Sequence, residues 1–282
     1  MTRPFAFASL CILLLSACKK DGAIPAYVQL NVPVVEDANG HLVSSKITDL
    51  WVYLNDEPVG VWESGSHVPL IGAGTATLKV IAGVRNNGAS NDRIQYPFYQ
   101  TWQQTVNLVP EQTVNITPVF HYYDNAYFWL ADFETGNRFD TSDCTATLVL
   151  VPSDSTLVGQ GSHNGLIALD TDHSLYNGVS SGDPFYSTGP PAFLEMDYRS
   201  DTRIEVGVRY MYAGSLAQVT YAYLLATGNS GNVLPWNKVY IDLGTPWNQP
   251  GALDKRFYIR AKLENGATTG EVQVDNIKIV RH

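Results

Sequence analysis

Strict alternation of apolar and polar residues dominates this chain, and no stretch carries a sustained helical period. Successive side chains of a strand point to opposite faces, so the alternation predicts β-strands with one buried face. Clusters of Gly, Pro, Asn and Asp separate the alternating segments and predict turns between them. In the first part of the chain, strands are predicted at residues 27–32, 50–55, 75–82, 101–109 and 113–120.

A second series of alternating segments follows a boundary at residues 121–125. Its predicted strands are residues 126–133, 144–151, 165–170, 192–199, 203–212, 217–226, 238–243, 256–263 and 271–280. The strand number and spacing favour a small antiparallel sandwich for residues 26–121. They favour a β-jelly roll for residues 126–282. The sequence therefore predicts an all-β protein of two domains.

Composition and charge exclude several classes of protein. Hydrophobic residues make up 45% of the 282 residues and charged residues 16%, which excludes a disordered chain or a coiled coil. The formal net charge of −9 argues against a nucleic-acid partner, because phosphate binding needs clustered Lys and Arg. The sequence holds no Gly-rich phosphate loop before a helix, no nucleophile elbow and no His-Glu-x-x-His motif. These absences favour a non-catalytic protein.

The N-terminus has the order of a secretory signal, with Arg3, an apolar run over residues 5–15, and then Ser16-Ala17-Cys18. With Leu15, this last segment resembles the lipobox of bacterial lipoproteins. The resemblance implies that residues 1–17 are a signal peptide and that Cys18 is acylated. Residues 18–25 then form a lipidated tether, and two or more acyl chains give stable membrane attachment. The alternative is an ordinary signal peptide with an incidental Cys.

The charged residues 19–22 directly follow Cys18. They resemble the surface-export signal of certain Gram-negative lipoproteins, although a flexible charged linker has the same composition. The resemblance implies an outer-membrane lipoprotein that faces the cell exterior. In the first predicted domain, residues 52–60 and 78–83 resemble bacterial immunoglobulin-like or transthyretin-like lipoprotein modules. That resemblance implies that residues 26–121 form an immunoglobulin-like β-sandwich, which acts as a spacer.

Three segments of the second domain, residues 132–136, 161–169 and 270–279, resemble the galactose-binding-like jelly rolls of carbohydrate-binding modules. The resemblance implies glycan binding and one structural calcium ion. Its carboxylate ligands would be Glu134 and Asp275. Calcium prefers six to eight oxygen ligands, and carboxylates on the first and last strands would join the two ends of the domain. The alternative is that both acids are solvated residues at strand ends.

Candidate ligand-binding residues come from the alternation and from the loops. Glu195 and Asp197 share one face of a predicted strand, and Arg209 lies on the polar face of the next strand. Carboxylates and a guanidinium on one face suit sugar hydroxyl groups, although a solvated face with cross-strand ion pairs gives the same pattern. Trp247, in a turn-rich loop, is the first candidate for an exposed stacking platform, and Trp236 is the second. A structural plug is the alternative for both.

We therefore expect a cell-surface lipoprotein that is not an enzyme and binds glycan through its C-terminal jelly roll. The alternative is a structural or adhesive surface protein, such as an assembly subunit, without sugar affinity. A third possibility is a glycoside hydrolase, because a retaining enzyme needs two carboxylates about 5–5.5 Å apart. The spacing of Glu195 and Asp197 permits this separation. The third acid expected in jelly-roll glycosidases is missing, because Arg199 and Ser200 occupy its place. Expected partners are a membrane, through the lipid anchor, and a glycan or another surface protein.

Overall fold

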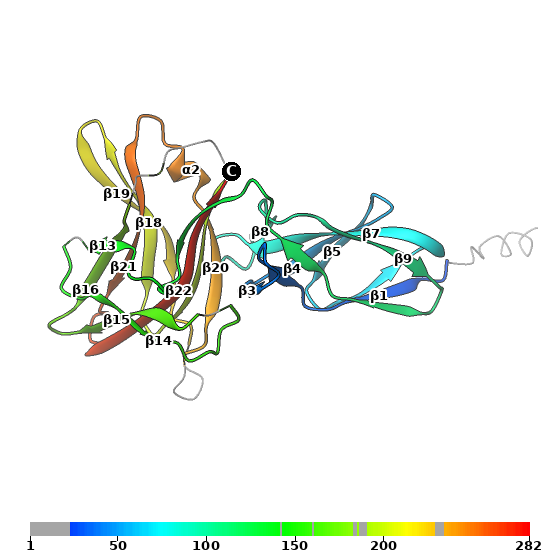
Figure 1. Cartoon of the computed structure of the whole chain (residues 1–282), viewed down its shortest axis with the longest axis horizontal. Helices are drawn as coiled ribbons and strands as arrows, with labels where there is room; N and C mark the ends of the chain where they lie inside the picture. The colour runs from blue at the N-terminus through cyan, green and yellow to red at the C-terminus, as the bar shows by residue number, and fades with distance from the viewer. Residues whose placement is uncertain (1–22, 142, 160, 183–184, 186–190, 229–233) are drawn as a thin grey trace, which may run out of the picture.

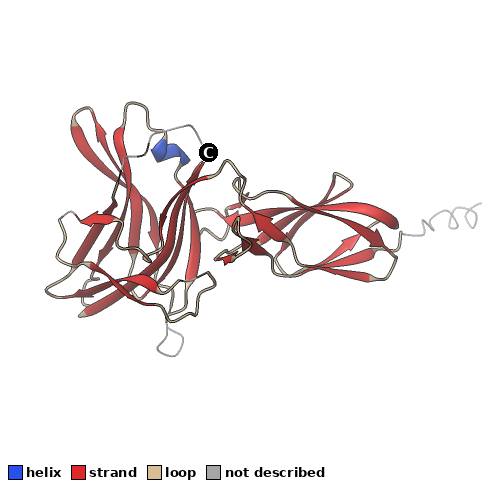
Figure 2. Ribbon diagram, viewed as in Figure 1, coloured by secondary structure: helices blue, strands red, loops and turns tan. Residues whose placement is uncertain are grey.

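The computed structural model describes residues 23–141, 143–159, 161–182, 185, 191–228 and 234–282. The predicted signal peptide, Cys18 and residues 19–22 of the predicted tether lie outside these ranges. The described chain is nearly all strand, so the predicted all-β class is confirmed (Figure 2). None of the described helices has the length and apolar character needed to cross a membrane.

The strands form two units that lie end to end (Figure 1). The N-terminal unit comprises β1–β11, and the C-terminal unit comprises β12–β22 with one short helix, α2. The chain enters the N-terminal unit at the tip farthest from the C-terminal unit. The C-terminus lies close to the junction of the two units.

The N-terminal unit contains two three-stranded sheets and one larger sheet. The first small sheet has the order β10 (Thr113–Ile116), β1 (Ala26–Leu30), β6 (His67–Leu70). The second has the order β11 (Val119–His121), β2 (Val34–Glu36), β3 (Leu42–Val43). The larger sheet has the order β5 (Glu57–Glu63), β4 (Asp49–Leu54), β7 (Gly74–Arg85), β8 (Arg93–Gln95), with β9 (Trp102–Leu108) also paired to β7.

The C-terminal unit consists of a six-stranded and a five-stranded sheet. The six-stranded sheet has the order β14 (Leu148–Pro152), β15 (His163–Asp170), β22 (Thr269–Arg281), β17 (Ala192–Ser200), β20 (Asn237–Asp242), and β12 (Tyr127–Ala131) pairs with β22. The five-stranded sheet has the order β13 (Phe139–Thr141), β16 (Leu175–Ser180), β21 (Leu253–Lys262), β18 (Ile204–Tyr212), β19 (Ser215–Leu224). The helix α2 spans Gly244–Trp247.

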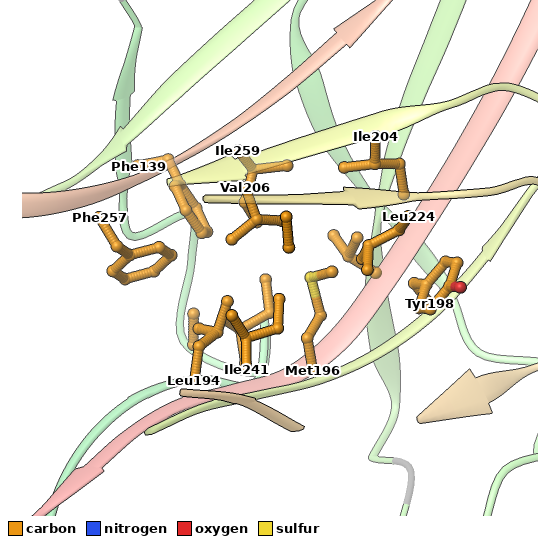
Figure 3. Packing of buried hydrophobic residues seen from close by; sticks show 14 of the residues in the cluster. Phe139, Leu194, Met196, Tyr198, Ile204, Val206, Leu224, Ile241, Phe257 and Ile259 are labelled. Carbon is orange, nitrogen blue, oxygen red and sulfur yellow. The ribbon is translucent and has the colours of Figure 1, made fainter. Parts of the chain in front are cut away.

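The core of the C-terminal unit lies between its two sheets (Figure 3). Leu194 and Met196 of β17 project from one sheet toward Val206 of β18 and Ile259 of β21 on the other. These residues occupy the apolar positions of the sequence alternation. The predicted inward faces of β17 and β18 are therefore confirmed. Several strands with weaker alternation, such as the neighbouring β16, were not predicted from the sequence.

The two units share apolar packing at their junction. Phe193, Tyr240 and Val280 of the C-terminal unit are buried in the same hydrophobic cluster as the core of the N-terminal unit. The ring of Tyr96 meets those of Phe193 and Tyr240 edge to face, at centroid distances of 5.3 and 4.9 Å. Such aromatic pairs add to the stabilisation from burial alone. The outer face of the six-stranded sheet is therefore an internal contact over β17 and β20.

Charged side chains are buried beside this apolar contact. The Glu195 carboxylate accepts hydrogen bonds from the hydroxyls of Tyr96 (2.6 Å) and Tyr122 (2.9 Å) of the N-terminal unit. Lys238 Nζ lies 3.4 Å from Glu195 and 3.7 Å from the carboxylate of Asp197. Asp197 also accepts a 2.6 Å hydrogen bond from the Ser44 hydroxyl. One ammonium group therefore lies between two carboxylates, each of which accepts a hydrogen bond from a hydroxyl of the other unit.

Burial favours the neutral forms of Glu195, Asp197 and Lys238. The contacts between these opposite charges favour the charged forms instead. Burial acts to raise the pKa of Glu195, but Lys238, Lys278 and the two tyrosine hydroxyls together hold that pKa below its ordinary value. Burial raises the pKa of Asp197 despite Lys238 and the Ser44 hydroxyl. Burial acts to lower the pKa of Lys238, but the two carboxylates raise it above its ordinary value. The ammonium of Lys238 therefore keeps its charge inside the junction.

Lys238→Met is expected to destabilise the protein by about 3–5 kcal/mol, because it leaves two buried carboxylates without their closest cation. The free energy of unfolding in urea at pH 7 measures the effect. Lys262→Met is the matched control, since Lys262 is exposed on β21 and forms no ion pair in the described part of the chain. Equal stability of the two variants would contradict the assigned role of Lys238.

Candidate functional site

The two sheets of the C-terminal unit differ in what covers their outer faces. The outer face of the six-stranded sheet is covered over β17 and β20 by the N-terminal unit. The outer face of the five-stranded sheet points away from that junction (Figure 1). A glycan site on an open sheet face is therefore restricted to the five-stranded sheet or to its edges.

Polar side chains from three strands of the sheet, β16, β21 and β19, connect across this open face. Gln218 of β19 donates a 3.2 Å hydrogen bond to the side-chain oxygen of Asn177 on β16. The hydroxyls of Thr220 and Tyr258 lie 2.7 Å apart. Because β21 and β18 separate β16 from β19, the contact of Gln218 with Asn177 shows that the side chains bridge the face.

A glycine makes room for this arrangement in the middle of β18. A Cβ atom on Gly207 would lie 2.1 Å from the carbonyl oxygen of Val219 and within 2.8 Å of the Tyr258 ring. A larger residue at this position would displace the strand or the ring. The Tyr258 ring is buried here under the polar layer, so it does not offer an exposed stacking surface.

A groove with a volume of 450 Å³ opens at the hairpin end of the same face. Arg209 and Arg256 line it together with the acids Asp140 and Asp254 and apolar side chains, among them Met211. Arg256 is held by Asp254, at 3.2 Å, and by the carbonyl oxygens of residues 180 and 182. Within the described ranges, the guanidinium of Arg209 forms neither a hydrogen bond nor an ion pair. All the N–H donors of the Arg209 guanidinium are therefore available to a ligand.

The predicted grouping of Glu195 and Asp197 with Arg209 is wrong. The two acids lie on β17 of the six-stranded sheet, whereas Arg209 lies on β18 of the other sheet. Both acids are 0% exposed, so they do not form part of an open binding face. The alternation placed them correctly on the outer face of their strand, but it carried no information about the unit that covers this face. The glycoside hydrolase alternative relied on these same two acids. Because both are buried, it has no candidate catalytic residues left.

The predicted exposure of Trp247 is also wrong, because its side chain is 1% exposed in the turn of helix α2. Its ring lies 4.9 Å from that of Phe185, and its carbonyl oxygen accepts a 2.6 Å hydrogen bond from Lys255. Trp247 is thus a plug at the end of the core. Trp236 is half-buried, with the Arg199 guanidinium 4.8 Å from its ring, and it lines a hollow separate from the Arg209 groove.

The first and last strands of the C-terminal unit lie side by side, as the jelly-roll hypothesis required. β12 pairs with β22 in antiparallel register, with Ala131 opposite Ile277. Glu134 follows β12, and one of its carboxylate oxygens accepts a 2.8 Å hydrogen bond from the backbone of His163. A Cβ on Gly161 would lie 2.3 Å from that oxygen, so the glycine admits the carboxylate.

Asp275 of β22 is a buried carboxyl group with one unpartnered oxygen. Its side chain is 1% exposed, and its Oδ1 accepts a 2.7 Å hydrogen bond from the Asn276 backbone. Its Oδ2 has no hydrogen-bond partner. Burial raises the pKa of Asp275 to about 7, and the charges of Asp197, Asp132 and Glu134 contribute to the increase. A buried carboxylate oxygen that has no hydrogen-bond donor and lies near other acids would be stabilised by a bound cation.

The described residues contain no group of three or more His, Cys, Asp or Glu side chains arranged to hold a metal ion. A cation beside Asp275 would therefore need backbone oxygens or water in addition to carboxylates, which is common for calcium. A cleft of 730 Å³ runs along the junction of the two units and reaches Glu134 and Asp132. Tyr122, Phe128 and Lys278 also line this cleft, which sequence reasoning missed because it forms only when the units meet.

No protein-family model and no curated protein matches this chain. Solved structures match at low identity. One is a structure from a study of carbohydrate-binding modules of the β-sandwich superfamily. It is 16% identical, the match covers 92% of this chain and 97% of the matched chain, and the TM-score is 0.42. A carbohydrate-binding module specific for non-crystalline cellulose has 17% identity over 53% of this chain and 91% of its own, with a TM-score of 0.39.

A third structure is a module in complex with β-1,4-galactotriose, with 16% identity, 54% of this chain and 94% of that chain covered, and a TM-score of 0.34. The cellulose and galactotriose named above are ligands of the matched proteins. With TM-scores below 0.5, the ligand of this chain has to be argued from its own geometry.

Proposed function

We propose that this chain is a lipid-anchored surface protein that binds carbohydrate, without catalysing a reaction, through the open face of its five-stranded sheet. The observation that carries the proposal is the groove around Arg209, whose guanidinium has no partner in the described part of the chain. The carboxylate of Asp140 lines the same groove. Directed donors and acceptors above an open sheet suit the hydroxyl groups of a sugar chain.

The apolar lining of the groove complements its polar groups. Val179, Met211 and Leu216 line it beside the two arginines. Sugar rings present C–H groups as well as hydroxyls, so a groove with both kinds of lining matches both kinds of surface. The Gln218–Asn177 contact continues the polar surface across neighbouring strands. The face as a whole offers an extended rather than a deep site, which suits an oligosaccharide chain better than a single small molecule.

The arrangement of the units supports an anchored role. The described chain begins at the tip of the N-terminal unit, and the C-terminal unit lies at the opposite end (Figure 1). An anchor at Cys18 would therefore place the whole N-terminal unit between the membrane and the five-stranded sheet. A spacer of this kind suits a receptor on the outer membrane that faces the exterior.

Arg209→Met is expected to weaken glycan binding about tenfold or more, because hydrogen bonds from a charged donor to the ligand are lost. The measurement begins with a glycan array probed with residues 19–282 and continues with calorimetric titration of the best ligand. Lys262→Met removes an exposed cation from the same sheet and should leave affinity unchanged. A blank array, or equal affinity of Arg209→Met and wild type, would contradict the proposal.

The edge strand β19 favours the alternative of a protein contact. Its side chains Leu216, Val219, Tyr221 and Tyr223 are exposed, and no charged residue occurs between positions 210 and 237. Edge strands usually carry charges or prolines that prevent pairing with other chains. A blank glycan array together with self-association or capture of a defined surface protein would select this alternative.

We also propose a structural calcium ion beside Glu134 and Asp275. The unpartnered Oδ2 of Asp275 and the neighbouring acids support it, since a bound cation would remove their repulsion. The ion would fix the loop after β12 to the last strand. The cleft at the junction would give it a route from solvent.

Chelator is expected to lower the melting temperature, and added calcium to restore it, because a ligand of the folded state stabilises by about 2.7 kcal/mol at a hundredfold excess over its Kd. Asp275→Asn should abolish the response, whereas Asp140→Asn, outside the cluster, should retain it. Differential scanning calorimetry and elemental analysis provide the two measurements. Identical melting of the wild type with and without chelator, and no bound metal, would exclude the site.

Attachment to the membrane is proposed to depend on Cys18, which the Leu15-Ser16-Ala17-Cys18 motif supports. Cys18→Ser is expected to move the protein from the membrane fraction to the soluble fraction or to prevent its processing. Cys11→Ser, inside the predicted signal peptide, is the control and should not change the location. Mass spectrometry of the mature protein should find an acylated Cys18 at the N-terminus. A mature chain that begins elsewhere, without lipid, would disprove the anchor.

A further inference from the structure

A pocket with a volume of 340 Å³, the seam pocket, lies at the junction of the two units, separate from the cleft that reaches Glu134. Lys46, Arg85 and Asn87 line it from the N-terminal unit. Tyr223 and Asn237 are among the residues that line it from the C-terminal unit. Sequence patterns could not predict this pocket, because its two walls are remote from each other along the chain.

Two cations in this pocket have no acidic partner. Arg85 Nε is buried and lacks a hydrogen-bond partner. Lys46 Nζ donates a hydrogen bond to the side-chain oxygen of Asn237, which is a neutral group. Partial burial lowers the pKa of Lys46, and the charge of Arg85 lowers it further. None of the described residues that line the pocket is acidic.

Other cations of this chain, whose net charge is −9, do have carboxylate partners. Arg93 is paired with Asp49, and Arg199 with Asp154. Lys238 also reaches the pocket, but Glu195 and Asp197 balance its charge. The charges of Lys46 and Arg85 are therefore the ones that remain available to an anion.

The pocket walls are held in place without a ligand. The backbone N–H of Lys46 donates a 3.1 Å hydrogen bond to the Tyr240 hydroxyl. The N–H of Asn87 donates to the Tyr240 carbonyl oxygen at 2.8 Å, and the side-chain oxygen of Asn87 accepts from the N–H of Asp242 at 3.0 Å. These contacts hold Lys46, and the chain segment directly after Arg85, against strand β20 of the other unit. A preorganised site loses less entropy when it binds a ligand.

Apolar surface adjoins the two cations. The side chain of Tyr223 is 57% exposed and that of Leu225 is 72% exposed, and both line the pocket. An aromatic ring and a leucine beside two cations suit a ligand that joins an anionic oxygen group to a partly apolar ring. A free inorganic anion would leave this surface unused.

We propose that the seam pocket binds the anionic oxygen group of an acidic sugar, a carboxylate or a sulfate, between Arg85 and Lys46. This inference rests on the proposed carbohydrate function and adds a second, charge-selective site to it. The guanidinium donates two parallel hydrogen bonds to the anion, and the ammonium contributes a point charge. The sugar ring then lies against Tyr223 and Leu225. Because both units build the pocket, the bound ligand also stabilises their docking.

The test titrates residues 19–282 with tri-galacturonate, sulfated galactose, neutral galactotriose, sodium acetate and sodium sulfate by calorimetry. Arg85→Gln and Lys46→Gln should each weaken binding of the acidic sugars at least tenfold, because each removes a charge-assisted contact. Arg85→Lys keeps the charge and should retain more affinity than Arg85→Gln. Lys79→Gln is the charge control, since Lys79 pairs with Asp56 away from the pocket. Urea denaturation confirms that each variant is folded.

The outcomes separate this site from the Arg209 groove. Acidic sugars that bind Arg85→Gln and Lys46→Gln as tightly as wild type, or that do not bind wild type, overturn the seam site. Neutral galactotriose that binds in an Arg209-dependent manner would leave the proposed function intact in that case. Acetate or sulfate that binds as tightly as the acidic sugars, with the same dependence on Arg85, overturns the sugar assignment. Preference for tri-galacturonate or for sulfated galactose identifies the anionic group.

Discussion

The contact of Lys238 with Glu195 and Asp197, enclosed by hydroxyls of the N-terminal unit, determines how the two units sit together. Removing these three charges from water costs several kcal/mol for each ion, and their attraction offsets this cost only in good geometry. The hydroxyls of Tyr96, Tyr122 and Ser44 complete that geometry. A displaced N-terminal unit would leave the carboxylates without these donors. The contact therefore favours one relative orientation, and apolar packing around Phe193 and Tyr240 supplies the favourable burial.

This fixed orientation gives the C-terminal unit one covered and one open outer face. A glycan on the outer face of β17 would have to displace the N-terminal unit, whereas the groove at Arg209 is accessible without rearrangement. The same orientation creates the cleft that reaches Glu134 and the pocket that contains Lys46 and Arg85. Neither hollow would exist in a chain whose units were joined only by a flexible linker. The docking contact is thus a condition for any site at the seam.

Much of the fold was accessible from the sequence, because alternation depends on local burial. It predicted the apolar faces of β17 and β18, and the jelly-roll hypothesis placed the first strand beside the last, as the pairing of β12 with β22 confirms. It failed where exposure depends on distant residues. Glu195 is polar and faces outward from its strand, yet another unit covers it. Trp247 lies among turn residues, yet a single helical turn inserts its ring beside Phe185. Periodicity identifies the face of a side chain but not what covers that face.

The pairing of charges gives a better criterion for the sites than residue type does. In an acidic chain, carboxylates are abundant, and several cations pair with one, as Arg93, Arg199 and Arg256 do. A cation without such a partner keeps an unfavourable desolvation energy that a ligand can relieve. Arg209 meets this condition on the open sheet, and Lys46 with Arg85 meets it at the seam. Asp275 is the reverse case, a buried acid with an unpartnered oxygen that a cation could stabilise. The unmatched charges therefore locate the places where this fold gains most from binding a partner of opposite charge or a strong hydrogen-bond acceptor.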